Sequence, residues 1–341
     1  MLAEIHSQNK QNEMNYRKLG KTGWSVSEIA LGTWQVGGGW GKPFDDKLAN
    51  KIIHTAIDSG INFIDTADVY DGGLSEAAVG KAVRESPERI YVATKCGRRI
   101  QPHVNEGYTP KILRAFVEAS LQNTGLDGID LIQLHCPPSP VYERDEIFEL
   151  FEKLKEEGKI NAMGVSVETV DQALAAMKYD IVSSIQVIFN MFRHKPTETL
   201  FPYPKIDNFG IIARIPLASG LLTGKLSSKT VFSKEDHRLF NRHGEAFDKG
   251  ETFSGIDYDK GLQAVGELKD IFSGNESLAA WAVRWVLMFP EVSTVIPGAS
   301  KIDQVLSNVE ASSLPEISSK DMEAVRNIYD RYFKADIHHL W

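Results

Sequence analysis

The sequence contains few of the features that mark disulfide-rich, metal-dependent, nucleic-acid-binding or membrane-spanning proteins. Only two of the 341 residues are cysteines, Cys96 and Cys136, and they form neither a disulfide framework nor a metal-ligand spacing. The formal net charge of −8 makes the chain as a whole a poor partner for nucleic acid or an anionic membrane. No apolar run reaches the length needed to cross a bilayer. We therefore expect a cytoplasmic protein with no nucleic-acid or membrane partner and no bound metal.

The first thirteen residues also lack the apolar core of a signal peptide. We predict that residues 1–13 are a mobile extension and that residues 14–341 form a single domain, since 42% of the chain is hydrophobic and 25% is charged. The aromatic tail from residue 312 is expected to pack on this domain, where it would help to close a substrate pocket.

Apolar, strand-like segments alternate with amphipathic, helix-like segments along most of the chain. The expected strands are residues 28–33, 62–66, 90–95, 130–135, 161–167, 184–189, 210–217 and 293–297. The clearest helical segments are residues 45–60, 75–86, 109–125 and 144–159, with Ser75 as an N-cap of the second and Thr109 opening the third. Eight strands with helical crossovers predict an α/β protein with the (β/α)8 TIM barrel fold.

A glycine-rich nucleotide-binding turn is missing, which weakens the main alternative, a doubly wound open sheet. The segment GGGWG (37–41) lacks the GxGxxG spacing and opens no helix, so we interpret it as a flexible loop at the barrel mouth. Residues 218–257, after the seventh strand, are polar and without periodicity, which is typical of a lid or a ligand clamp. Disorder is the alternative, although the leucine and phenylalanine residues of this segment disfavour it.

Three successive expected strands end in ionisable residues. Asp65, Lys95 and His135 stand at these ends, and Tyr70 follows Asp65 by five residues. The C-terminal ends of the strands surround the active site of such a barrel, so we expect the four side chains to meet there. Each residue alone is more often a turn former, a solvated charge or a core residue. Their coincidence on consecutive strands favours a catalytic role.

This combination of side chains suits the reduction of a carbonyl group. A free tyrosine, with a pKa of about 10, is a poor acid at neutral pH. The Lys95 ammonium, held in place by Asp65, would lower the pKa of Tyr70, while His135 would orient the substrate oxygen. The sequence therefore predicts Tyr70 as a general acid.

The segments after the seventh and eighth strands suit an anionic ligand. IPLASGLLTGK (215–225) and VIPGASKIDQVLSN (295–308) occupy the region where such barrels often bind phosphate at a helix N-terminus. Ser300 and Lys301 stand at that expected N-terminus, and an ordinary capped helix explains them equally well.

The two cysteines directly follow Lys95 and His135, so the alternation of a strand would point both thiols away from the mouth. We interpret them as small buried residues, with a redox-sensitive pair as the alternative. Four aromatic residues are candidates for a pocket wall or for ordinary packing: Trp34, Trp40, Phe189 and Trp341.

Eight segments spread from Asn15 to about Leu314 together follow the pattern of one family. They are YRKLGKTGWSVSEIALGTW, FIDTADVYDGGLSEAAVGKA, IYVATK, LIQLH, GVS, IQVIFN, PLASGLLTGK and IPGASKIDQVLSN. In this highly specific combination the chain resembles the aldo-keto reductases. The stretch DHRLFNRHGEAFDKGETFSG is similar to the general-stress and inositol-related bacterial branch.

The resemblance implies a catalytic tetrad of Asp65, Tyr70, Lys95 and His135. It also implies an extended NADP(H) molecule at the barrel mouth, bound without a Rossmann domain. The cofactor-binding residues that it implies are Gly32, Thr33, Trp34, Asp65, Ser166, Gln186, Arg214, Pro216, Leu217, Ser219, Gly220, Leu221, Thr223, Lys225, Gly298, Ser300, Lys301, Gln304 and Asn308.

Three positions depart from the family pattern. Val167 follows Ser166 where the family often has asparagine, so one hydrogen bond to the nicotinamide carboxamide is in doubt. Arg214 stands where an aromatic residue commonly stacks on the nicotinamide, and a planar guanidinium can also stack on a ring. Gln304 stands where many NADP-preferring members have arginine.

The function that follows is NADPH-dependent reduction of an aldehyde or ketone to an alcohol, with a small carbonyl compound as substrate. Two alternatives stay open. One is a nicotinamide-binding regulatory subunit with little turnover, because some family members serve ion channels. The other is a barrel that binds a sugar phosphate without redox chemistry. The oligomeric state also stays open.

Overall fold

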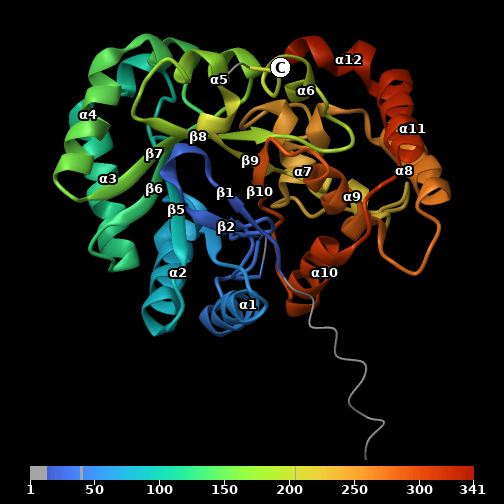
Figure 1. Cartoon of the computed structure of the whole chain (residues 1–341), viewed down its shortest axis with the longest axis horizontal. Coiled ribbons are helices and arrows are strands. Elements are labelled where there is room, and N and C mark those ends of the chain that lie inside the picture. The colour runs from blue at the N-terminus through green and yellow to red at the C-terminus, as the bar shows by residue number, and fades with distance from the viewer. Residues whose placement is uncertain (1–13, 39–40, 204) are drawn as a thin grey trace, which may run out of the picture.

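Eight parallel strands form the centre of the computed structural model, which describes residues 14–38, 41–203 and 205–341 (Figure 1). Neighbouring strands follow chain order, and the bounds are β3 Leu31–Gly32, β4 Phe63–Asp65, β5 Tyr91–Cys96, β6 Ile129–His135, β7 Ile160–Ser166, β8 Val182–Ile188, β9 Gly210–Arg214 and β10 Val292–Val295. The first and last strands also meet, since Ala30 N donates to the Val295 carbonyl at 2.8 Å. The (β/α)8 prediction is therefore confirmed. The seventh strand ends at Arg214 rather than at residue 217, because Ile215 has a φ of 56°.

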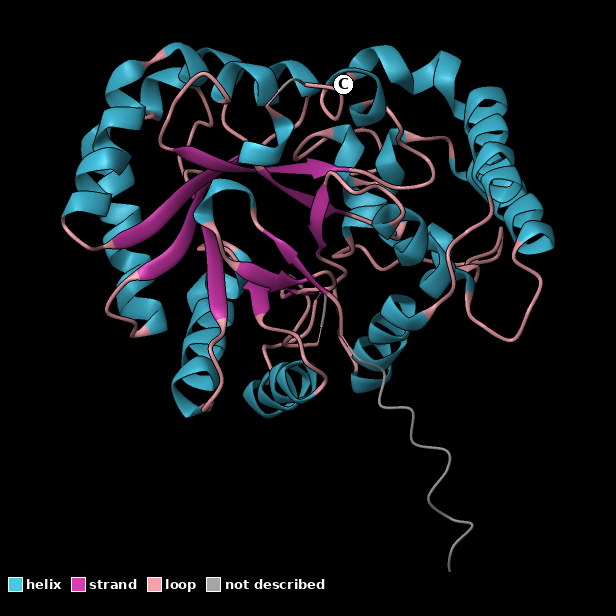
Figure 2. Ribbon diagram, viewed as in Figure 1, coloured by secondary structure: helices cyan, strands magenta, loops and turns pink. Residues whose placement is uncertain are grey.

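Helices surround the strands on the outside (Figure 2). Their bounds are α1 Asp46–Asp58, α2 Leu74–Glu85, α3 Pro110–Thr124, α4 Asp145–Glu156, α5 Val170–Ala176, α6 Pro196–Thr199, α7 His237–Phe240, α8 Tyr258–Ile271, α9 Leu278–Leu287, α10 Ile302–Ser313, α11 Ser319–Tyr329 and α12 Ala335–Ile337. No helix within the described ranges combines the length and apolar composition of a membrane span. Residues 1–13, the expected extension, lie outside the described residues.

The helix starts show which N-cap predictions hold. Thr109 caps α3 by accepting a hydrogen bond from Ile112 N at 3.3 Å. Ser75 is not an N-cap, so that prediction was wrong. It lies inside α2, is fully buried, and donates to Thr33 Oγ1 at 2.8 Å. Gly73, with a φ of 95°, takes the N-cap position because the preceding turn requires a left-handed backbone.

A β-hairpin that the sequence analysis did not predict lies at the N-terminal end of the barrel. It consists of β1 Tyr16–Lys18 and β2 Ser25–Ser27. Leu19 and Val26 from this hairpin pack with the barrel-lining side chains of Phe63 and Leu131 in one buried cluster. The barrel interior is therefore filled at this end, which leaves the C-terminal ends of the strands for ligands.

Residues 218–257 are ordered into short helical turns at Ala218–Thr223, α7, Lys249–Glu251 and Phe253–Gly255, so disorder does not describe this segment. Asn241 holds it together: its side-chain oxygen accepts hydrogen bonds from Ala246 N and Phe247 N, both at 2.8 Å. The C-terminal helices run along its outer side and reach α6, where Lys334 pairs with Glu198 at 3.1 Å (Figure 1).

Candidate active site

The four side chains predicted to form the catalytic group lie together at the C-terminal ends of β4, β5 and β6. Lys95 Nζ is 2.5 Å from Asp65 Oδ1 and 3.2 Å from Tyr70 Oη, and it also donates to the Thr66 carbonyl at 2.8 Å. The His135 ring lies edge-on to the Tyr70 ring, with 6.1 Å between the centroids. The prediction that these four side chains lie close together is therefore confirmed.

Parallel pairing of the strands explains this arrangement. Lys95 pairs with Gln133 in β6, and both side chains point into the barrel, whereas the neighbouring Cys96 packs outward in the helix-facing core. Gln133 and Gln186 donate to Asp65 Oδ2 at 3.1 and 2.8 Å. The carboxylate is therefore held from both sides, with one oxygen on Lys95 and the other on the two amides.

Burial controls the proton affinities of this group. Burial raises the pKa of Tyr70 above its ordinary value, and Lys95 opposes this shift without reversing it. The predicted sign of the lysine effect holds, but the predicted net lowering of the Tyr70 pKa does not. Burial alone would lower the pKa of Lys95, yet Asp65 and Tyr70 raise it. At neutral pH both groups are therefore protonated.

His135 is a neutral imidazole in this environment. Burial, followed by the charges of Arg98 and Lys95, holds its pKa well below the ordinary value. Its Nδ1 atom is buried and has no hydrogen-bond partner among the described residues. A neutral imidazole whose ring lines the site can orient a polar ligand by a hydrogen bond without adding charge.

A cavity of about 940 Å³ extends from Tyr70 and His135 across the ends of β7, β8 and β9 to the start of α10. Of the nineteen residues predicted to bind a cofactor, seventeen line this cavity. Leu221 and Ser300 do not line it. Leu221 faces Gly261 in α8, and the backbone N–H of Ser300 donates a hydrogen bond to Gln304 Oε1 at 2.7 Å. Gly41 lines the cavity, whereas Gly39 and Trp40 lie outside the described residues.

The end of the cavity near α10 has the features of an anion site. Lys301 occupies the N-cap position of α10 without a side-chain cap, so the first backbone N–H groups of the helix remain available. Lys301, Gln304 and Asn308 line the cavity beside Lys225, and Arg238 from the 218–257 segment lines it as well. Arg238 was not predicted, because residues 218–257 show no periodicity that would place a side chain.

Four charged residues that we call the mouth ion cluster lie beside the tetrad: Arg98, Glu168, Arg214 and Glu251. Arg214 Nη2 is 3.0 Å from Glu168, and Arg98 Nη2 is 3.3 Å from Glu251. The cross pairs, Arg98 with Glu168 and Arg214 with Glu251, are 3.6 and 3.7 Å apart. Burial raises the pKa of Glu168 to about 7. Burial acts in the same direction on Glu251, but the two arginines hold the pKa of Glu251 below its ordinary value.

The sequence analysis identified only Arg214 in this cluster. Arg98 lies three residues beyond Lys95, and Glu168 two residues beyond Ser166, so both follow strands whose ends were already implicated. Their positions just after these strand ends could have identified Arg98 and Glu168 from the sequence. Glu251 had no such signal, because it reaches the mouth from the irregular segment.

Cys136 does not point away from the mouth as predicted. Its φ of 50° breaks the strand alternation, and its Sγ lies 3.5 Å from Ser166 Oγ and 3.6 Å from Arg214 Nη2. Cys136, Glu168 and Glu251 form the one cluster with metal-ligand spacing in the described ranges. The arginines already pair with both carboxylates and repel a cation, so this cluster is a poor metal site.

Of the aromatic residues that were candidates for the pocket wall, one lines the cavity and two pack elsewhere. Trp34 lines the cavity, with its ring centroid 6.2 Å from that of Tyr70, and Phe247 lines it with its ring centroid 6.4 Å from that of Trp34. Phe189 is fully buried against Trp285, so of the two possibilities for this residue ordinary packing holds. Trp341 packs behind the wall: its Nε1 donates to Asp248 Oδ1 at 3.0 Å. The tail therefore supports the pocket wall from outside and does not line the cavity.

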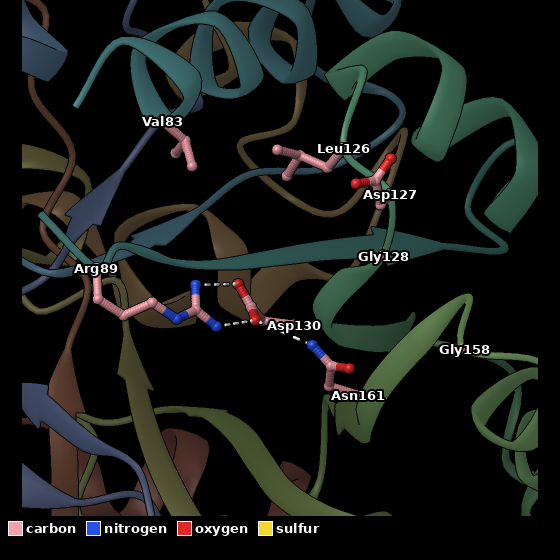
Figure 3. Close-up of a pocket in the computed structure, with 8 residues that line it drawn as sticks. All are labelled: Val83, Arg89, Leu126, Asp127, Gly128, Asp130, Gly158 and Asn161. Carbon is pink, nitrogen blue, oxygen red and sulfur yellow. Dashed lines mark hydrogen bonds and ion pairs between the residues drawn. The ribbon is translucent and has the colours of Figure 1, made fainter. Parts of the chain in front are cut away.

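A second cavity, of about 380 Å³, lies at the opposite end of the strands (Figure 3). Asp130, at the start of β6, accepts hydrogen bonds from the Arg89 guanidinium, from Val92 N at 3.0 Å and from Asn161 Nδ2 at 3.2 Å. Both carboxylate oxygens are thereby satisfied. This end therefore has the character of a structural tie between β5, β6 and β7.

Comparisons with known proteins agree with this geometry. The aldo/keto reductase family model matches residues 28–330. The aldo-keto reductase YhdN of Bacillus subtilis is 32% identical, over 92% of this chain and 93% of YhdN. A probable voltage-gated potassium channel subunit beta of rice (Oryza sativa) is 30% identical, over 92% of this chain and 96% of the rice protein.

Among solved structures, the glycerol dehydrogenase AKR11B4 of Gluconobacter oxydans is similar, with a TM-score of 0.75 and 32% identity. The match covers 93% of this chain and 96% of that one. The shared barrel, the matching family model and the grouping of Asp65, Tyr70, Lys95 and His135 lead to one conclusion. The chain belongs to the aldo/keto reductase family.

Proposed function

We propose that the protein is an NADP(H)-dependent oxidoreductase that reduces an aldehyde or ketone to an alcohol. The observation that carries this proposal is the position of Lys95 Nζ, between Asp65 Oδ1 at 2.5 Å and Tyr70 Oη at 3.2 Å, at the edge of the large cavity. A protonated tyrosine beside a buried ammonium is a suitable proton donor to a carbonyl oxygen.

The tetrad residues have separate roles in this proposal. Tyr70 donates its phenolic proton to the carbonyl oxygen, and Lys95 stabilises the resulting phenolate until a proton returns from solvent. Asp65 fixes the ammonium. His135 remains neutral and orients the substrate oxygen by a hydrogen bond. The bound nicotinamide supplies the hydride that the carbonyl carbon receives.

The cavity fits an extended dinucleotide. Ser166 and Gln186 line the cavity and are our candidates for binding the carboxamide, and most residues of the 216–225 segment line it as candidates for binding the pyrophosphate. Lys301 at the open N-terminus of α10 would bind the 2′-phosphate of NADP(H). Val167 has no amide side chain, so this chain would have one carboxamide donor fewer than the asparagine-containing pattern.

A regulatory subunit with little turnover is the second candidate function. It is favoured by the similarity to the rice potassium channel subunit. The two buried free thiols, Cys96 and Cys136, suit a cytoplasmic location for either candidate.

The test is a titration with NADPH and with NADH, followed by quenching of tryptophan fluorescence and then by turnover of 4-nitrobenzaldehyde. Saturable NADPH binding with repeated turnover is expected. NADPH binding without turnover would favour the regulatory candidate, and binding of neither nucleotide would contradict both.

The phosphate assignment needs a matched pair of lysine variants. Lys301→Ala should weaken NADPH binding by about tenfold or more and leave NADH binding unchanged. Lys320→Ala, on the exposed start of α11, is the control that should leave both unchanged. Equal loss of both nucleotides in Lys301→Ala would remove the 2′-phosphate argument.

A further inference from the structure

Trp341 packs outside the cavity against a turn that carries one residue of the mouth ion cluster. We call this turn, residues 248–255, the mouth turn. Trp341 Nε1 donates to Asp248 Oδ1 at 3.0 Å, and the ring lies so close to Gly255 that no side chain would fit there. The Arg193 guanidinium lies 4.1 Å from the ring centroid, and Trp341 is only 8% exposed. The ring is therefore enclosed by the mouth turn and by Arg193.

The backbone of the mouth turn is strained and depends on contacts from outside the turn. Phe253 and Ser254 have positive φ values of 51° and 58°, in a region that residues with a side chain rarely adopt. Such a conformation persists only where the surrounding structure holds it. Asn190 Nδ2 donates to Ser254 Oγ at 2.7 Å, and the Trp341 ring packs on the next residue, Gly255. Loss of the ring should therefore let the turn relax.

The inner side of the mouth turn is joined to two parts of the cavity wall. Ser219 Oγ accepts a hydrogen bond from Phe253 N at 3.0 Å and donates to the Glu251 carbonyl at 3.1 Å. Both Ser219 and Glu251 line the cavity. The Glu251 carboxylate is paired with Arg98 at 3.3 Å and with Arg214 at 3.7 Å. A displacement of the turn would therefore move a candidate nucleotide contact and the mouth ion cluster together.

Arg193 gives the ring a second connection to the mouth ion cluster. Its Nη2 atom donates to the Glu168 carbonyl at 2.7 Å, while its guanidinium lies over the Trp341 ring. Burial lowers the pKa of Arg193 to about 9, so an aromatic face is a favourable neighbour for this desolvated charge. One ring thus supports both glutamates of the cluster, Glu251 through the mouth turn and Glu168 through Arg193.

These contacts point to a role in ligand binding for a residue behind the cavity wall. We propose that Trp341 is a positioning residue that holds the mouth turn, and with it Ser219 and Glu251, in the conformation that retains the bound nucleotide. Its contacts are with Arg193 and the mouth turn rather than with the tetrad, so the proton-transfer step should be unaffected. This inference rests on the proposed binding of NADP(H) and adds a residue to it.

The experiment measures the rate at which NADPH leaves the whole chain, from the loss of NADPH emission after rapid mixing with excess NADP⁺. Trp341→Ala should raise this rate by about tenfold, because the mouth turn loses its outer support. Trp341→Phe keeps a ring between Gly255 and Arg193 and loses only the hydrogen bond to Asp248. It should therefore raise the rate by only about twofold to threefold, which is a partial rescue.

A comparison of binding with chemistry distinguishes positioning from general damage. In Trp341→Ala the Kd of NADPH should rise in parallel with the dissociation rate. The rate of hydride transfer to 4-nitrobenzaldehyde, measured in a single turnover at saturating NADPH, should stay within about twofold of wild type. Asp65, Tyr70 and Lys95 retain their mutual contacts in this variant, which is why the chemical step should be preserved.

Two variants control for loss of stability and for disturbance of the tail. Trp24→Ala removes a ring that stacks on Tyr91 at the opposite end of the barrel, with 4.9 Å between the centroids. It should lower the thermal midpoint and leave NADPH dissociation within about twofold of wild type. Leu340→Ala changes an exposed side chain next to Trp341 in sequence and should alter neither quantity.

The outcomes separate this inference from the proposed function. A wild-type protein that binds neither NADPH nor NADH would overturn the proposed function, and this inference with it. If NADPH binds but leaves Trp341→Ala no faster than wild type, only the inference about Trp341 is wrong. If Trp341→Ala does not fold, dissociation from Trp341→Phe at the wild-type rate would decide against it. Equal acceleration in Trp341→Ala and Trp24→Ala would also overturn it, because the effect would then come from reduced stability.

Discussion

The N-terminal and C-terminal ends of the barrel both bury carboxylates beside guanidinium groups, but they satisfy them differently. At the N-terminal end, Arg89 and Asn161 donate hydrogen bonds to Asp130 (Figure 3), and Val92 N completes the hydrogen bonding of its two oxygens. At the C-terminal end, Glu168 Oε1 and Glu251 Oε1 meet the arginines only in ion pairs of 3.3 to 3.7 Å. Complete hydrogen bonding of a carboxylate is typical of structural ties, whereas charged groups with longer contacts beside a cavity are typical of binding sites.

The largest effect that we expect at either end of the barrel is the loss of activity when one hydroxyl group is removed at the C-terminal end. Tyr70→Phe should lower kcat by about 10²- to 10⁴-fold because the carbonyl oxygen loses its proton donor. NADPH affinity should stay near the wild-type value. Single-turnover kinetics with NADPH would measure the loss. Tyr16→Phe removes a hydroxyl that donates to the Gly60 carbonyl at the other end, and it should retain full activity. Equal activity of the two variants would exclude Tyr70 as the acid.

The reverse result is expected at the N-terminal end, where a change should affect stability and leave catalysis intact. Asp130→Ala leaves the backbone N–H of Val92 and the Asn161 amide without their acceptor. We expect the free energy of unfolding to fall by about 2–4 kcal/mol, with kcat/KM within about twofold of wild type. Urea denaturation and steady-state kinetics test the two halves. A large loss of kcat/KM at unchanged stability would show that the two ends are coupled.

The buried carboxyl group of Asp68, near the C-terminal end of β4, makes a prediction about how protein stability depends on pH. Burial, reinforced by Glu76, raises the pKa of Asp68 to about 7, and the charges of Arg99 and Lys95 and the Val69 backbone only partly oppose this shift. The unfolded chain has a pKa near 4 here, so the folded state binds the proton more tightly. The contribution of Asp68 to wild-type stability should therefore fall as pH rises from about 4 to about 7.

Asp68→Asn removes this titration. The variant should be more stable than wild type by about 2–4 kcal/mol at pH 8, with little difference near pH 4. Thermal midpoints of the two proteins across this range would measure the effect. Parallel curves for wild type and variant would contradict a raised pKa at this position.

The smallest expected effect concerns Arg214. If its guanidinium lies against the nicotinamide, it repels the cationic ring of NADP⁺ and not the neutral ring of NADPH. Arg214→Tyr should therefore tighten NADP⁺ binding relative to NADPH by about threefold to tenfold, since Glu168 and Glu251 already offset part of the charge. Isothermal titration with both forms measures the ratio. An unchanged ratio would place the guanidinium away from the ring.

The sequence was most informative where function coincides with periodic structure. Asp65, Lys95 and His135 could be predicted because strand alternation and parallel pairing determine where strand-end side chains point. Cys136 could not be placed, because a positive φ at the end of β6 breaks that alternation. The prediction that Ser75 is an N-cap failed because its hydroxyl group donates to Thr33 in the core and does not bind the first backbone N–H groups of α2.

The mouth ion cluster shows the limit of such reasoning. Glu251 comes from a segment without periodicity, and its position depends on contacts that are distant in sequence, such as Ser219 with the Glu251 carbonyl and Trp341 with Asp248. The net pKa of Tyr70 was missed for a similar reason, because desolvation depends on the packed environment rather than on neighbours in the chain.

The closure of the barrel has a consequence for how the chain folds. The hydroxyl of Thr294 donates to the carbonyl of Ser27 at 2.8 Å, across 267 residues of sequence. Until β10 joins β3, both strands adjoining this seam have unpaired backbone groups, and closing so long a loop costs conformational entropy. During synthesis we therefore expect the earlier β/α units to form an open sheet before the last strand emerges. The interval before the last strand emerges is when this chain is most exposed to edge-to-edge association with other chains.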